Sequence, residues 1–190
     1  MSHLRRTVMR TRLLLVFTLA LGAFSGAQAR VQGGNDQGSA AFEQLKSLVG
    51  IWEGVMPAKK GEGEASEEPS AETMKMRVEY RLTAGGSVIQ ETFNGGTPME
   101  MITMYHDTQK GLRLTHYCML GNQPGMDYTG ARDGALHFTL SEDSDLDKDK
   151  DAFMHSLALT IVDDKNIVQG WTMYRDGEAQ SQDIHLTRVK

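Results

Sequence analysis

The chain contains a single cysteine among its 190 residues, so it cannot form an intramolecular disulfide. Basic residues are also scarce after the N-terminal segment. The first 29 residues hold four of the 20 Lys+Arg and none of the 25 Asp+Glu, which leaves 16 basic against 25 acidic residues, a net charge of −9. This deficit argues against nucleic acid and anionic membrane surfaces as partners.

Common signatures of catalytic and nucleotide-binding sites are missing from the sequence. It has no P-loop, no glycine-rich dinucleotide fingerprint, no G-x-S-x-G elbow and no H-E-x-x-H pair. The acidic run at residues 141–151 places aspartates at alternate positions, but it lacks the glycine and glutamate of an EF-hand calcium loop. No residue is therefore assigned a catalytic or metal-binding role, and no cofactor is expected.

Long apolar runs are absent after the first 29 residues. The early run Leu13–Ala23 is too short to span a bilayer comfortably, follows four arginines, and precedes the small-x-small site Ala27-Gln28-Ala29. Residues 1–29 are predicted to be a signal peptide cleaved after Ala29, which indicates a periplasmic or secreted protein. No cysteine directly follows the run, so no lipid anchor is expected.

Residues 30–38 are predicted to be a flexible leader, and residues 39–190 a single domain. Ser39 is positioned to cap a short helix whose apolar side includes Phe42 and Leu45. The charged stretch 58–71 has no aromatic residue and is interpreted as a surface loop.

Most of the domain alternates between apolar and polar residues in short segments separated by turn signals such as Asn94-Gly95-Gly96. The predicted strands cover residues 51–56, 72–82, 87–93, 99–106, 112–118, 127–132, 135–140, 152–162, 167–174 and 181–189. No βαβ pattern is present. We expect an all-β fold, an antiparallel up-and-down β-barrel of about 8–10 strands with a short N-terminal helix, or a related sandwich. Such a barrel can hold one small ligand.

Four side chains capable of chemistry fall on apolar strand faces. His116 and Cys118 are two residues apart and are predicted to share a face, while Glu91 and His155 lie on the apolar faces of other strands. If all four point inward, they could orient a polar ligand, bind a metal or carry out acid–base chemistry. The alternative is a buried polar network in which Cys118 acts as a small hydrophobe.

Further candidates for ligand contacts lie nearby. Asn122 and Gln123, in the loop after Cys118, offer amide donors and acceptors at the predicted barrel mouth, although Gly and Asn also suit a tight turn. Trp171 is a candidate lining residue. The pairs Met74/Met76 and Met99/Met101 favour a core or a pliable pocket over copper ligation by thioethers.

The run Gly50-Ile51-Trp52, directly after the predicted helix, resembles the opening of calycin barrels, a group that includes lipocalins, fatty-acid-binding proteins and nitrobindins. In several members an arginine of the last strand packs on this tryptophan, and Arg188 occupies the matching position. The resemblance implies structural roles for Gly50, Trp52 and Arg188. The haem-binding histidine of nitrobindins has only His185 as a counterpart, which alternation turns outward, so haem is not expected.

A second resemblance covers Tyr105 and the THYC-x-x-GNQP run of residues 115–124. Together they resemble a family of secreted bacterial proteins without an assigned function. It favours Tyr105 and this run as part of the site. Together, these features predict an exported lipocalin-like barrel that binds a small, largely apolar molecule. The alternatives are an enzyme or metal site at His116, Cys118, His155 and Glu91, or an interaction module. Oligomeric state is left open.

Overall fold

The computed structural model describes residues 36–57 and 73–190. The predicted signal peptide with its cleavage site, most of the predicted leader, and the predicted 58–71 loop lie outside the described residues. Within the described part of the chain, no helix has the length and hydropathy needed to cross a membrane.

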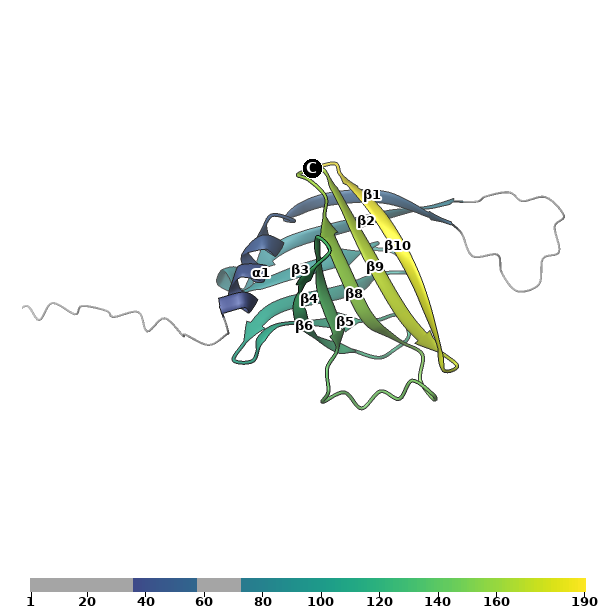
Figure 1. Cartoon of the computed structure of the whole chain (residues 1–190). Helices are drawn as coiled ribbons and strands as arrows, with labels where there is room; N and C mark the ends of the chain where they lie inside the picture. The colour runs from purple at the N-terminus through teal and green to yellow at the C-terminus, as the bar shows by residue number, and fades with distance from the viewer. Residues whose placement is uncertain (1–35, 58–72) are drawn as a thin grey trace, which may run out of the picture. The chain divides into compact units, whose positions relative to one another are not determined.

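Ten antiparallel strands close into one barrel in which each strand pairs with its neighbours in sequence and β1 pairs with β10 (Figure 1). The strands are β1 (Gly50–Pro57), β2 (Thr73–Thr83), β3 (Val88–Phe93), β4 (Met101–Thr108), β5 (Gly111–Tyr117), β6 (Gly125–Arg132), β7 (Ala135–Leu140), β8 (Phe153–Ile161), β9 (Asn166–Arg175) and β10 (Glu178–Arg188). The predicted fold class is confirmed, and the arrangement fits a calycin-like fold.

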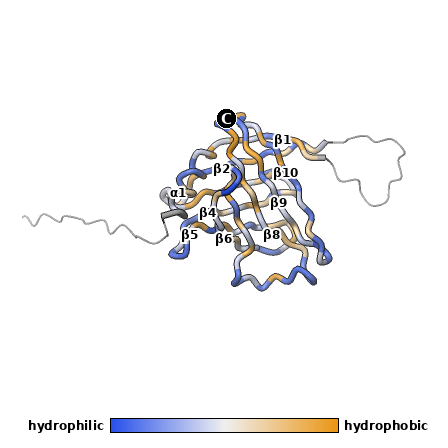
Figure 2. The backbone as a smooth tube through the Cα atoms, viewed as in Figure 1, coloured by the Kyte–Doolittle hydropathy of each residue, from blue (hydrophilic) through white to orange (hydrophobic). Residues whose placement is uncertain are grey.

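Alternation of side chains explains why these segments form a barrel with one core. Inward positions on β3 are Ile89, Glu91 and Phe93, and all three are buried, as the sequence pattern predicts. The switch between hydrophobic and hydrophilic residues along the strands is visible in Figure 2. His185 on β10 is exposed between the buried Ile184 and Leu186, as predicted.

Strand β8 departs from the predicted alternation. On β8, Met154 faces Met173 and Ser156 faces Thr172, so a β-bulge leaves His155 without a partner on β9. A bulge inserts one residue and reverses which face the preceding residues occupy. The prediction that His155 shares the inward face of Leu157 is therefore wrong.

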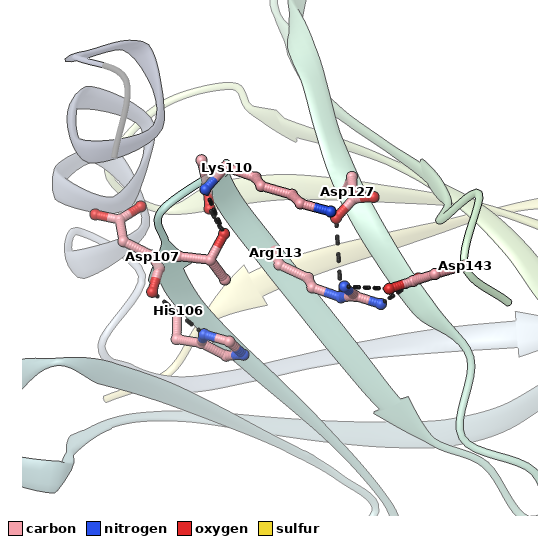
Figure 3. Close-up of polar contacts among 8 residues, drawn as sticks. His106, Asp107, Lys110, Arg113, Asp127 and Asp143 are labelled. Carbon is pink, nitrogen blue, oxygen red and sulfur yellow. Dashed lines mark hydrogen bonds and ion pairs between the residues drawn. The ribbon is translucent and has the colours of Figure 1, made fainter. Parts of the chain in front are cut away.

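Helix α1 (Asp36–Lys46) packs against β4 and β5 at one end of the barrel (Figure 1). Phe42 and Leu45 are buried there, as their spacing predicts. The helix begins three residues before Ser39, so this residue is not its N-cap. The Ser39 hydroxyl instead donates to the Asp107 carboxylate on β4 over 3.1 Å, and Asp107 is shown in Figure 3.

Arg188 closes the same end of the barrel. Its guanidinium carbon lies 4.1 Å from the centre of the Trp52 ring, and these two residues face each other across β1 and β10. The guanidinium also donates to the carbonyl oxygens of Val49, Ser47 and Asp164 over 2.8, 2.6 and 2.8 Å. One side chain therefore joins the helix exit, the first strand and the β8–β9 turn.

Gly50 makes room for this closure. Its φ is +142°, and a Cβ at this position would lie 2.5 Å from the Lys190 carbonyl oxygen and 2.7 Å from an Arg188 nitrogen. A side chain would be strained by the backbone conformation and would also displace the arginine. The Gly-x-Trp run is thus explained by the fit between the first and last strands.

We predict that Arg188→Met lowers the free energy of unfolding by about 2 kcal/mol, because three carbonyl oxygens and the Trp52 ring lose their cationic partner. Urea unfolding followed by circular dichroism measures the change. The exposed Arg175, replaced in the same way, is the control and is expected to change stability by less than about 0.5 kcal/mol. Equal losses in the two variants would contradict the closing role of Arg188.

Candidate functional site

A cavity of about 720 Å³ occupies the barrel end opposite α1. Its lining comes from the ends of β1, β3, β5 and β9 and the starts of β2, β4, β8 and β10, which all meet at this end. Buried residues such as Trp171 line its depth, while Met119 and the exposed Gln180 and Ser181 stand at its edge. The volume falls within the range of small-molecule sites in proteins.

Methionine dominates this cavity. Seven of the chain's 12 methionines line it: Met56, Met74, Met99, Met101, Met119, Met154 and Met173. Both predicted Met-x-Met pairs contribute, since Met74 comes from the first pair and Met99 and Met101 are the second. Unbranched thioether side chains adapt to irregular shapes, so the wall of this cavity can fit several apolar ligands.

A row of polar side chains crosses the inner face of four adjacent strands. Cross-strand pairing places Tyr80 opposite Glu91, Glu91 opposite Thr103, and Thr103 opposite His116. The four residues are buried, and two of them, Glu91 and His116, line the cavity. Because directly paired residues are neighbours on one face of a sheet, the row is continuous from β2 to β5.

Gln169 connects this row to the opposite wall. Its amide nitrogen donates to the Tyr80 hydroxyl and, over 2.9 Å, to one oxygen of Glu91. Its amide oxygen accepts a hydrogen bond from the Trp171 indole over 3.1 Å. The second Glu91 oxygen accepts from the Tyr105 hydroxyl over 2.6 Å. The network therefore satisfies both oxygens of a buried carboxyl group and forms the floor of the cavity.

Burial controls the ionisation of this floor. It raises the pKa of Glu91, although the hydrogen bonds from Tyr105, Gln169 and Tyr80 act in the opposite direction. The pKa values of Tyr80 and Tyr105 are raised well above the ordinary value, first by burial and then by the neighbouring Glu91 charge. Both tyrosines therefore stay protonated and act as fixed donors at neutral pH.

His116 is the second polar group in the depth of the cavity. Its Nδ1 lies 2.9 Å from the Thr103 hydroxyl, and its ring centre lies 5.0 Å from that of Trp171. Burial lowers the pKa of His116 to about 4, so the imidazole is neutral at pH 7. Its Nε2 is buried and has no hydrogen-bond partner within residues 36–57 and 73–190.

Two of the predicted residues do not join Glu91 and His116. Cys118 follows the end of β5, is half-buried and is not among the residues that line the cavity; burial raises the pKa of its thiol. His155 packs edge-to-face against Tyr174, with ring centres 4.9 Å apart. The predicted grouping of four reactive side chains is thus reduced to two. In the described part of the chain, no group of three His, Cys, Asp or Glu side chains is arranged to hold a metal ion.

Tyr105 and Trp171 are both in the site region, but in different roles. Trp171 lines the cavity, as predicted, while Tyr105 is fully buried beneath it and contacts Glu91. Binding by either residue stays a prediction. Sequence reasoning overlooked Gln169 and Thr103 as members of the site. Gln169 lies two residues before Trp171 on β9, so alternation places both on one strand face. This alternation could have identified Gln169 from the sequence.

Asn122 and Gln123 lie in a different hollow of about 390 Å³, which Arg113 and Asp143 also line. Arg113 donates to both oxygens of Asp143, over 2.9 and 3.2 Å, and approaches Asp127 at 3.8 Å (Figure 3). The hydrogen bonds from Arg113, together with its positive charge, lower the pKa of the Asp143 carboxyl group. The Asn122 amide donates to the Ala152 carbonyl over 2.8 Å, which attaches the loop to the start of β8.

Comparison with protein families finds none that matches this chain, and comparison with characterised proteins likewise gives no match.

We predict that His116→Gln removes part of the acid sensitivity of folding. Because the pKa of His116 is about 4 in the folded state against 6.5 ordinarily, the unfolded chain binds more protons between these values. Stability contributed by neutral His116 is therefore lost as pH falls from 6.5 toward 4. Between pH 7 and pH 4, the unmodified protein should lose about 3 kcal/mol more than the variant in urea unfolding.

Other acidic and basic groups titrate in both proteins, so their contributions cancel in this comparison. Glu91 acts in the opposite sense, because a raised carboxyl pKa removes stability as pH increases. Equal acid losses in the two proteins would show that His116 is not kept neutral by burial.

We predict that Asn122→Ala lowers stability by about 1 kcal/mol, through loss of the hydrogen bond to Ala152. Gln123→Ala is the matched control in the same loop. Among the described residues its amide donates to the nearby Gly121 carbonyl alone, over 3.3 Å, and the side chain is exposed, so a change below about 0.5 kcal/mol is expected. Chemical denaturation compares the two, and a larger loss for the Gln123 variant would contradict the attachment.

Proposed function

We propose that this protein is an exported barrel that binds a small, largely apolar molecule in its interior. One observation carries the proposal, a cavity of about 720 Å³ lined by seven methionines. Ligand sites in proteins combine a mainly apolar wall with a few placed polar groups. Here the wall consists mainly of methionine and aromatic side chains, and its buried polar side chains are those of Glu91 and His116.

The burial of the rest of the interior supports this reading. Tyr105, Leu114 and Phe138 fill the barrel between the cavity and α1, and they are fully buried. A barrel that needed only stability would extend this packing to its other end, because each unfilled volume costs stability. The flexible methionines instead surround a volume suitable for a guest.

Export is part of the proposal and rests on the sequence alone. The basic start, the short apolar run and the Ala27-Gln28-Ala29 site form a signal peptide, and the remaining chain has one cysteine. The ligand would then be a molecule of the periplasm or of the surroundings of the cell.

We predict that the purified protein binds the neutral fluorophore N-phenyl-1-naphthylamine at one molecule per chain. Met101→Glu, inside the cavity, should weaken binding at least tenfold, because an apolar guest would then have to desolvate a carboxylate. Met104→Glu is the control, because Met104 lies three residues further along β4, between the inward Thr103 and Tyr105, and does not line the cavity.

Fluorescence titration gives the affinities, and circular dichroism with thermal melting verifies that each variant folds. Met173→Glu, from the opposite wall of the cavity, is a second test of the same expectation. Native mass spectrometry of protein isolated from a bacterial periplasm would identify a natural guest by its mass. Absence of fluorophore binding, or equal binding by the Met101 and Met104 variants, would overturn the proposed function.

A further inference from the structure

His116 contributes a polar group whose chemistry can be worked out from its neighbours. The residue is 4% exposed and lines the cavity. Of its two ring nitrogens, Nδ1 is paired with Thr103 on the neighbouring strand. Nε2, the ring nitrogen farther from the backbone, has less than 1 Å² of its own surface exposed, so a guest's oxygen reaches it once a neighbouring side chain moves aside. It lacks a hydrogen-bond partner in the described part of the chain, and leaving such a buried group unpaired costs free energy.

The Thr103 hydroxyl determines which nitrogen carries the proton. Its one side-chain hydrogen bond within the described residues is to His116 Nδ1. If Nδ1 donated, the hydroxyl hydrogen of buried Thr103 would be left without an acceptor. If the hydroxyl donates to Nδ1, that hydrogen is satisfied and the imidazole proton belongs on Nε2. The second arrangement leaves fewer buried groups unpaired, so Nε2–H is a donor.

The charge of the surroundings limits what can accept this hydrogen bond. None of the described residues that line the cavity is lysine or arginine, and Glu91 is two strands from His116 in the same polar row. A carboxylate or phosphate guest would be buried without a cation and near another acid, which is costly. A neutral oxygen acceptor has no such cost.

We propose that the guest is a neutral, mainly apolar molecule with an acceptor oxygen, such as a ketone, ester or ether, and that His116 Nε2–H binds this oxygen. The inference rests on the proposed function and names the ligand class of the same cavity. The guest enters with its oxygen toward the floor, beside Trp171, and its apolar part lies among the methionines near the edge.

Two naphthalene probes of nearly equal size test the proposal. The ketone 2-acetylnaphthalene has the acceptor oxygen, and 2-ethylnaphthalene lacks it. Each competes with N-phenyl-1-naphthylamine for the purified protein, and the ratio of their dissociation constants is compared between variants. The comparison cancels the difference in hydrophobicity between the probes. Loss of the donor should reduce the relative preference for the ketone by about tenfold.

Three substitutions separate the two ring nitrogens. His116→Phe removes both and should lose the ketone preference. His116→Asn places its amide group near Nδ1, so the amide oxygen can accept the hydrogen bond of the Thr103 hydroxyl while the donor at the Nε2 position is lost. His116→Gln places its amide nitrogen near Nε2 and should retain much of the preference. An unchanged ratio in the Phe and Asn variants, with fluorophore binding intact, would overturn the inference and leave the proposed function standing.

The proton position is measured separately in the unmodified protein, which avoids any folding defect. Nitrogen-15 NMR of histidine-labelled protein at pH 7 should show the Nε2–H tautomer for His116, assigned by its loss in His116→Gln. An Nδ1–H tautomer would overturn the inference, because the cavity would then present an acceptor. If N-phenyl-1-naphthylamine fails to bind at all, the proposed function fails and the inference fails with it.

Discussion

The hydrogen bonds of Gln169 across the barrel interior are the interaction on which the site depends. Gln169 belongs to β9, yet it donates to Tyr80 on β2 and Glu91 on β3. Without this amide, a buried carboxyl group would lose a donor and the Trp171 indole would lose its acceptor. Since unpaired buried groups are costly, the side chains of this network hold one another in place. They divide the interior into a packed core and a cavity.

The two ends of the barrel differ in how their interiors are filled. Near α1, Arg188 and Trp52 close the barrel and the core is filled with fully buried side chains. At the other end, seven methionines line a volume of about 720 Å³. Leaving that volume unfilled costs stability, whereas the closed end and the hydrogen-bonded floor contribute to it.

Parts of the candidate site were predictable and others were not. His116 and Glu91 lie where alternation places them, because β3 and β5 are regular up to those residues. His155 is displaced by the bulge at Met154–Ser156, and no residue in that segment signals an insertion. Asn122 and Gln123 contribute to a separate hollow beside Arg113. Gln169 was missed because its partners are 78 and 89 residues away in the sequence.

The sequence by itself determined the fold class, the number and order of strands, and the inward faces of the regular ones, because side-chain alternation and turn residues are local properties. The match between Gly50, Trp52 and Arg188 also followed from the sequence, as a resemblance that the paired first and last strands now explain. Only the tertiary structure decided which polar residues share the cavity. That outcome depends on the closure of β1 on β10, on one bulge and on contacts across the interior, and none of these is encoded in a local pattern.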